Sequence, residues 1–355
     1  MTGDELLPGR PILLAVRPME SLAEVQEALQ QAIEIELSTL PPYLYAAFTI
    51  KDSTYRAARE RIHSIVADEM VHMALACNVL NAIGGTPQLA LESVVPNYPG
   101  PLPYDIGARP GEEFSVSLLP FSEAAIVQAI RIESPEHPTR YPDARWRLDS
   151  RYRTIGQFYA ALADALKGLP VDAWSVTPRH QLTDHPFFAG RLLTVSDIAG
   201  AQQAIRRIVT EGEGTSTNAG TAESPLDFEG ELAHYWRLEE IRRNQVLERD
   251  PERAEGFSWG GPLRVDWPAV TVIADPGDHD FSGEPAGAQA AQRRCDRAFT
   301  ALLCELHRAV NGEPARLGNA VAAMFDLRRA ARIALATPLA DGRAAGPAFR
   351  FLSPP

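Results

Sequence analysis

The 355-residue sequence predicts a mainly α-helical protein built on a four-helix bundle. Apolar residues recur at helical spacing in two pairs of long segments, at about 21–50 with 54–83 and at about 196–213 with 229–248. A stretch at about 85–190, rich in proline, arginine and aromatic residues, separates the two pairs. Two helical hairpins joined by one long crossover are typical of a four-helix bundle.

Local signals set the expected ends of these segments. Ser21 with Glu24 three residues later is a capping-box pattern, and "GGTP" ends the second segment. Pro41 and Pro42 predict a kink or break in the first segment. The crossover contains one helical stretch, near "TIGQFYAALADALKGL", and two further helices are expected within about 286–336. We therefore predict a single elaborated domain over residues 20–350.

Composition excludes several classes of function. A net charge of −12 argues against nonspecific nucleic-acid binding, which depends on basic patches. Three cysteines without a Cys-x-x-Cys motif indicate a reducing compartment rather than a disulfide framework. The N-terminal segment lacks a signal-peptide pattern, and no apolar run approaches the roughly 20 residues of a membrane span. We expect a cytoplasmic protein that binds neither nucleic acid nor membrane, with no nucleotide cofactor.

Three Glu-x-x-His pairs carry the chemical signal: Glu60/His63, Glu69/His72 and Glu231/His234. With 27 Glu and 8 His in the chain, random placement predicts only about 0.6 such pairs. The spacing puts both side chains on one helical face, as in carboxylate-bridged two-metal bundles. Glu60 points away from the face of Glu69, so the first pair is interpreted as a solvated surface pair.

Two single carboxylates complete the predicted ligand set. Glu36 lies beside the apolar stripe of the first segment, and Glu211 shares a face with apolar residues of the third. The predicted metal ligands are Glu36, Glu69, His72, Glu211, Glu231 and His234. Carboxylates with imidazoles suit two iron ions, with manganese as the alternative. A lone helical carboxylate is usually solvated, so the set depends on its members acting jointly.

The blocks "EIELSTLPPYLYAAFTI", "RIHSIVADEMVHMALACNVLNAIGGTP", "AQQAIRRIVTEGEGT" and "ELAHYWRLEEI" carry a family resemblance. They resemble the ferritin-like domain of the iminophenyl-pyruvate dimer synthase family, over about residues 20–350. The resemblance implies a ferritin-like bundle with a non-haem metal site. It also implies oxidative coupling of imines derived from aromatic amino acids. The family enzymes are much longer than this chain, which corresponds to their ferritin-like part.

The leading hypothesis is a metal-dependent oxidase or oxygenase that uses O₂ on an amino acid or its imine, supplied by a partner oxidase. Tyr43, on the face of Glu36, is a candidate redox or hydrogen-bonding residue, although such tyrosines are more often core. Arg147 and Arg151 are candidate clamps for a substrate carboxylate, with a solvated loop as the alternative. Two rival functions stay open: ferroxidase-like chemistry, and a helical partner protein with a structural metal. A homo-oligomer is also left open.

Overall fold

The computed structural model describes residues 19–352, except for 51–54, 109–112, 136–151, 215–223, 254–255, 268–270 and the single positions 176, 184, 228 and 266. The described chain is mainly α-helical, as predicted, with one two-stranded sheet. No helix in these residues is long and apolar enough to cross a membrane.

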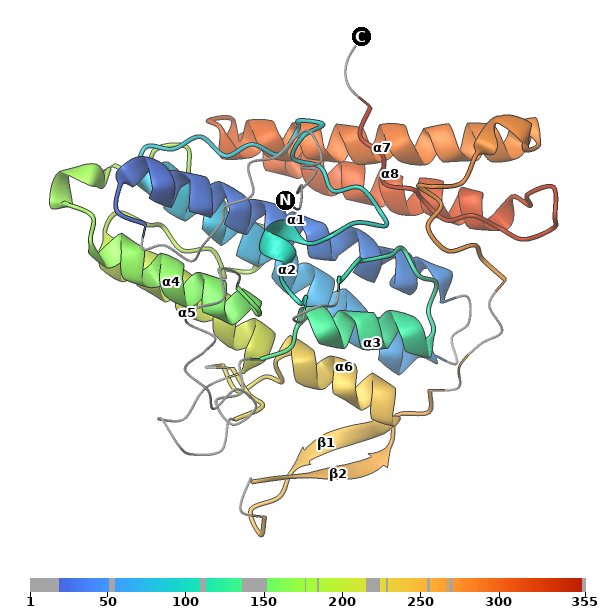
Figure 1. Cartoon of the computed structure of the whole chain (residues 1–355), viewed down its shortest axis with the longest axis horizontal. Coiled ribbons are helices and arrows are strands. Elements are labelled where there is room, and N and C mark those ends of the chain that lie inside the picture. The colour runs from blue at the N-terminus through green and yellow to red at the C-terminus, as the bar shows by residue number, and fades with distance from the viewer. Residues whose placement is uncertain are drawn as a thin grey trace, which may run out of the picture.

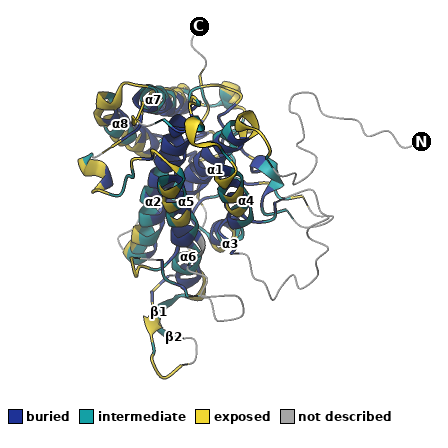
Figure 2. Cartoon of the chain, turned by 90° about the vertical axis from the view of Figure 1, so that its left-hand side faces the viewer, coloured by how far each residue is buried: buried dark blue, intermediate teal, exposed yellow. Residues whose placement is uncertain are grey.

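The centre of the molecule is an antiparallel hairpin of two long helices. Helix α1 spans Leu22–Thr49 and α2 spans Arg56–Ala82. The predicted capping box begins α1: the Ser21 hydroxyl accepts from the backbone N–H of Glu24, and the Glu24 carboxylate accepts from the backbone N–H of Ser21. Most residues of both helices are buried, because other helices cover them on several sides (Figure 2).

The break predicted at Pro41 and Pro42 is absent, because α1 continues through both prolines. Each proline removes a backbone donor and so leaves a carbonyl one turn earlier without its helical partner. For Pro42 that carbonyl belongs to Ser38, and the Tyr98 hydroxyl donates to it at 2.7 Å. A tertiary contact thus replaces the lost helical hydrogen bond.

Four shorter helices complete the bundle in an arrangement that the sequence did not predict. They are α3 (Glu123–Ile132), α4 (Ile155–Lys167), α5 (Ile198–Glu213) and α6 (His234–Arg243). Both α5 and α6 contact α2, while both α3 and α4 contact α1 (Figure 1). Helices α4 and α5 contact each other, as do α3 and α6. The bundle therefore has two long helices and two composite positions, each filled by two short helices.

Several predicted boundaries need correction. Helix α3 was not predicted, whereas α4 lies where the crossover was expected to be helical. The expected helix at 229–248 begins only at His234 and ends at Arg243. Its C-terminal part is instead a strand, β1 (Gln245–Arg249), paired antiparallel with β2 (Phe257–Pro262) in a hairpin that projects from the bundle (Figure 1).

A second helical hairpin covers one side of the central one. Helix α7 spans Ala286–Val310 and α8 spans Leu317–Ala336, close to the predicted C-terminal helices. They form a layer beside α1 and α2, on the side away from α3–α6 (Figure 1). Short 3₁₀ turns at Pro103–Asp105, Val171–Ala173, Pro186–Phe188, Phe281–Gly283 and Pro314–Arg316 lie in the connections.

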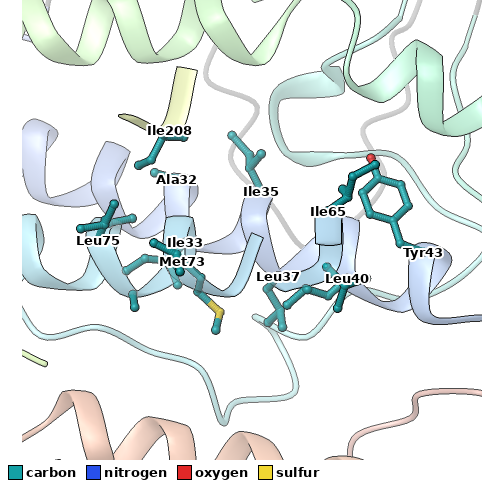
Figure 3. Packing of buried hydrophobic residues seen from close by; sticks show 14 of the residues in the cluster. Ala32, Ile33, Ile35, Leu37, Leu40, Tyr43, Ile65, Met73, Leu75 and Ile208 are labelled. Atoms are coloured by element: carbon teal, nitrogen blue, oxygen red, sulfur yellow. The ribbon is translucent and has the colours of Figure 1, made fainter. Parts of the chain in front are cut away.

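One large hydrophobic core runs through these layers. Leu37, Leu40 and Met73 extend from α1 and α2 toward the layer of α7 and α8, whereas Ile35 and Ile65 extend to the opposite side (Figure 3). Buried carboxylates and histidines from α1, α2, α3 and α6 gather inside the bundle and form one cluster.

Candidate metal centre

Five buried side chains form a carboxylate–histidine cluster inside the bundle: Glu36, Glu69, His72, Glu133 and His234. Helix α1 supplies Glu36, and α2 supplies Glu69 and His72 on one face, three residues apart. Glu133 is the C-cap of α3, and His234 is the first residue of α6. Each of the five is at most 4% exposed. Unpaired buried carboxylates are costly, so this concentration requires positive charge nearby.

The cluster divides into two ligand groups that share one residue. Glu36, Glu69 and His72 form the first group, and Glu69, Glu133 and His234 form the second. Within each group, one ligand atom per residue lies within 4.8 Å of the others. Glu69 belongs to both groups, which is the placement of a carboxylate that bridges two ions. The two imidazole rings lie 5.4 Å apart and are nearly parallel.

A further carboxylate, outside the two groups, contacts each imidazole on the side that faces away from the cluster. His72 Nε2 lies 2.8 Å from Oε2 of Glu211, and His234 Nε2 lies 3.3 Å from Oδ2 of Asp68. Because a carboxylate only accepts, each Nε2 carries the proton that it donates. Each Nδ1 therefore faces the cluster. Outer carboxylates of this kind orient metal-binding histidines and raise their basicity.

Arginines hold these outer carboxylates in place. Arg237 donates to Asp68 Oδ2 at 2.6 Å, and Arg191 also pairs with Asp68. Arg207 donates to Glu211 Oε1 at 2.7 Å. The guanidinium groups neutralise the outer carboxylates, so these need no further cation.

Burial and neighbouring charges shift the pKa values of the cluster residues. Burial, together with the negative charges of Glu133 and Glu36, raises the pKa of Glu69 well above its ordinary value. Burial alone would lower the pKa of His72, but its hydrogen bond with Glu211 and the nearby carboxylate of Glu36 raise it to about 10. The pKa of His234 is likewise raised, by Asp68 and Glu133 against the effect of burial. The site therefore favours cations strongly, whether protons or metal ions.

Hydroxyl groups fix the carboxylates from the sides. The Tyr43 hydroxyl donates to Glu133 Oε1 at 2.5 Å, and the Tyr159 hydroxyl of α4 donates to Glu36 Oε1. The Thr39 hydroxyl lies 3.1 Å from Glu69 Oε2. These contacts occupy one oxygen of each carboxylate, while Glu36 Oε2 and Glu133 Oε2 lie 3.7 and 3.6 Å from the histidine Nδ1 atoms.

The donor set fits divalent metal ions. His234 Nδ1 is buried and has no hydrogen-bond partner, although Oε1 of Glu69 lies 3.1 Å away. His72 Nδ1 lies 3.7 and 3.9 Å from oxygens of Glu36 and Glu69, which is beyond ordinary hydrogen-bond length. Nitrogen atoms aimed at carboxylate oxygens across such gaps leave room for an ion between them.

The structure brings four of the six predicted ligands together: Glu36, Glu69, His72 and His234. Glu211 is in the site, but behind the His72 ring rather than in a ligand group. The prediction of Glu231 as a ligand is wrong, since this residue is exposed and precedes the helix that begins at His234. Helical spacing fails there because Ala233 is the N-cap, with extended backbone angles.

The other predicted positions have different outcomes. Glu60 is exposed and pairs with Arg56, as the surface interpretation of its pair required. Tyr43 lies against the cluster through Glu133. Arg147 and Arg151 fall outside the described residues.

Sequence reasoning missed Glu133, Asp68 and Tyr159. Glu133 ends a ten-residue amphipathic helix whose N-cap, Ser122, is a readable signal. Asp68 directly precedes Glu69, and one-residue spacing gave no reason to place it behind a histidine of another helix. Tyr159 lies within the predicted helix of the crossover, but its pairing with α1 is a tertiary fact.

Comparisons with known proteins support the family and the fold. A sequence profile of the ferritin-like family matches residues 29–243. The 2-imino-3-(indol-3-yl)propanoate dimerase of Chromobacterium violaceum is 24% identical over 295 residues, which covers 72% of this chain but only 27% of that protein. The match supports the resemblance to imine dimer synthases stated from the sequence. A crystal structure of a ferritin-like protein from Caulobacter vibrioides superimposes with a TM-score of 0.61 at 23% identity. It covers 95% of this chain and all of that one, and it shows the fold alone.

Proposed function

Since the chain belongs to the ferritin-like family, we propose that it is a metal-dependent oxidoreductase of natural-product biosynthesis that oxidises a small molecule with dioxygen. The observation that carries the proposal is the pair of ligand groups sharing Glu69. Two ions bridged by one carboxylate, with an imidazole on each, form the kind of two-metal site that ferritin-like bundles build.

Iron is the metal that we propose, with manganese as the alternative, because carboxylates and imidazoles suit both. Glu36 and His72 would hold one ion, Glu133 and His234 the other, and Glu69 both. When bound, a pair of ferrous ions supplies electrons to dioxygen. Three residues would hold each ion, with Glu69 shared between the two groups.

The chain's own residues prepare the site for that chemistry. Asp68 and Glu211 keep a proton on each histidine Nε2, so that each Nδ1 is free to bind an ion. The hydroxyls of Tyr43 and Tyr159 donate to Glu133 and Glu36, which directs the second oxygen of each carboxylate inward. Apolar core residues surround the cluster and keep competing water out.

The proposed substrate is an imine derived from an aromatic amino acid and supplied by a partner oxidase. The support is the name of the similar dimerase, of which this chain spans about a quarter. Joining two such imines by one carbon–carbon bond removes two electrons and two protons, which reduce one dioxygen to hydrogen peroxide. An amino acid oxidised singly is the alternative that the same site would serve.

The test is metal analysis followed by oxygen consumption. Protein reconstituted anaerobically with ferrous iron should retain about two ions per chain, from the two ligand groups, and should consume dioxygen faster when the imine is present. His234→Ala should lose iron, while Glu60→Gln, an exposed carboxylate of a similar motif, should not. Iron that is oxidised without any effect of the imine would favour ferroxidase-like chemistry. Protein that retains neither iron nor manganese would contradict the proposal.

A further inference from the structure

A cavity of about 80 Å³ lies between the α1–α2 hairpin and the α7–α8 hairpin. It is on the opposite side of α1 and α2 from the carboxylate–histidine cluster. Leu37, Leu40 and Met73, which line it, extend toward the layer of α7 and α8 (Figure 3). The cavity and the cluster are thus separate places that share the walls of two helices.

The lining of this cavity is apolar throughout and rich in sulfur and aromatic rings. Met70, Met73 and Met324 contribute thioethers, so three of the five methionines in the chain meet here. Phe188 and Phe299 contribute rings. Methionine adapts its shape to a ligand, and its sulfur makes favourable contacts with aromatic rings. A lining of this composition favours a flat aromatic group over a polar or charged one.

Cys77 belongs to the same lining and behaves there as an apolar side chain. It is fully buried, and burial raises the pKa of its thiol well above the ordinary value. The thiol is therefore neutral, and it gives a ligand no charge to pair with.

We propose that this cavity binds the ring of a small, neutral aromatic molecule. Apolar cavities of this kind stay dry and accept benzene or xenon, the reference case being about 150 Å³. A cavity of about 80 Å³ is smaller, so it takes a single ring, with the flexible methionines giving way. Phe187, also in the lining, is 37% exposed, and a substituent on the ring can reach solvent there.

The site does not depend on the proposed function, because no cluster residue lines it. A ring bound here contacts both hairpins at once. It therefore stabilises the docking of α7–α8 on the bundle, since binding to the folded state alone stabilises that state.

The first test locates the bound ring in the unaltered protein. Methyl-¹³C-methionine labelling gives signals for Met70, Met73 and Met324 in the cavity and for Met19 outside it. Titration with benzene should shift the three cavity signals saturably, through the ring current, and leave Met19 unmoved. Absence of saturable shifts, or equal shifts at Met19, would overturn the proposal. Cyclohexane serves as the aliphatic comparison, and equal affinity for it would overturn the aromatic preference.

The second test fills the cavity. Ala320 lines it and is fully buried, whereas Ala322 is exposed on the same helix. Ala320→Leu should weaken benzene binding by at least about tenfold, because the added atoms take the ring's place. Ala322→Leu should leave the affinity unchanged. If Ala320→Leu binds benzene as the unaltered chain does, the ligand is not in this cavity.

Discussion

At the scale of single residues, the function of the cluster depends on which nitrogen of each histidine carries a proton. Asp68 and Glu211 settle this from outside the cluster, and both are themselves fixed by arginine. The raised pKa values favour a proton on Nδ1 as well. When an ion displaces that proton, the hydrogen bond at Nε2 leaves Nδ1 as the atom that faces the ion. The histidines are therefore oriented before any ion arrives.

Glu133→Gln should remove one of two bound ions, because the amide cannot replace a charged carboxylate ligand in the second group. Metal content after reconstitution with ferrous iron and gel filtration measures this directly. Glu231→Gln is the matched control and should retain both ions, since Glu231 is exposed and outside both groups. The reverse result would mean that Glu231, rather than Glu133, is the ligand.

Glu133 and Glu231 also show which parts of the site could not be predicted from the sequence. The pair Glu69/His72 was predictable because both residues lie inside one continuous helix, where spacing fixes direction. The same spacing failed at Glu231/His234 because a helix boundary falls between the two residues. Boundaries are the least certain part of any helix prediction. Glu133 has no spacing signal, since its partners come from other helices.

At the scale of elements, helix α1 keeps a double proline in its interior. Its position matters, because Glu36 lies just before the prolines and Tyr43 just after them. A break would separate these two side chains, which contact the same cluster from different positions along α1. The break predicted from the two prolines is wrong, because the hydrogen bond from Tyr98 to the Ser38 carbonyl supports the continuous helix.

Tyr98→Phe should destabilise the protein by about 1–3 kcal/mol, because the buried Ser38 carbonyl loses its partner. Chemical denaturation measures the change in the free energy of unfolding. Tyr55→Phe, at the start of α2 where the ring packs against Phe121, is the comparison and should have a smaller effect. Equal effects would mean that loss of any tyrosine hydroxyl, rather than support of α1, explains the result.

Asp296 on α7 makes stability depend on pH. Burial raises its pKa to about 6, against the hydrogen bond from Gln292, which lowers it. The folded state therefore holds a proton that the unfolded state releases near its ordinary pKa of 3.8. The resulting stabilisation is complete below that value and is lost as pH rises through about 6. Above that pH the ionised, buried carboxylate weakens the fold.

Asp296→Asn should accordingly stabilise the protein at pH 8, by an amount on the order of 2–3 kcal/mol. The gain should be smaller at pH 5, by about 1 kcal/mol. The new amide also has an acceptor nearby, because Oε1 of Gln292 is buried without a hydrogen-bond partner. Urea denaturation at both pH values measures the gain. Asp326→Asn, exposed on α8, should show no such dependence on pH.

At the scale of the whole molecule, the predicted bundle is confirmed, but the helices that fill two of its positions differ from those expected. The apolar periodicity predicted the long helices, since it depends on local pattern alone. It did not predict that α3 and α4 together occupy the position beside α1. That arrangement arises from packing between segments far apart in the chain, and it decides which carboxylate reaches the cluster.

Metal removal should destabilise the whole fold, because buried like charges lose the cations between them. At ion concentrations of 100 times the dissociation constant, one bound ion adds about 2.7 kcal/mol to the free energy of unfolding. Thermal unfolding with and without a chelator measures the difference. His234→Ala, with one ligand group disrupted, should show a smaller response to the chelator. An unchanged melting temperature in the unaltered chain would mean that no ion occupies the cluster.

The two ligand groups differ in how much of the chain must be in place before each exists. Glu36, Glu69 and His72 all belong to the α1–α2 hairpin, whose contacts are among the most local in the molecule. Glu133 and His234 come from helices that are far apart in sequence and meet only once the crossover has closed. Since local contacts form before distant ones, we expect the first ion position to arise early in folding and the second to mark its completion.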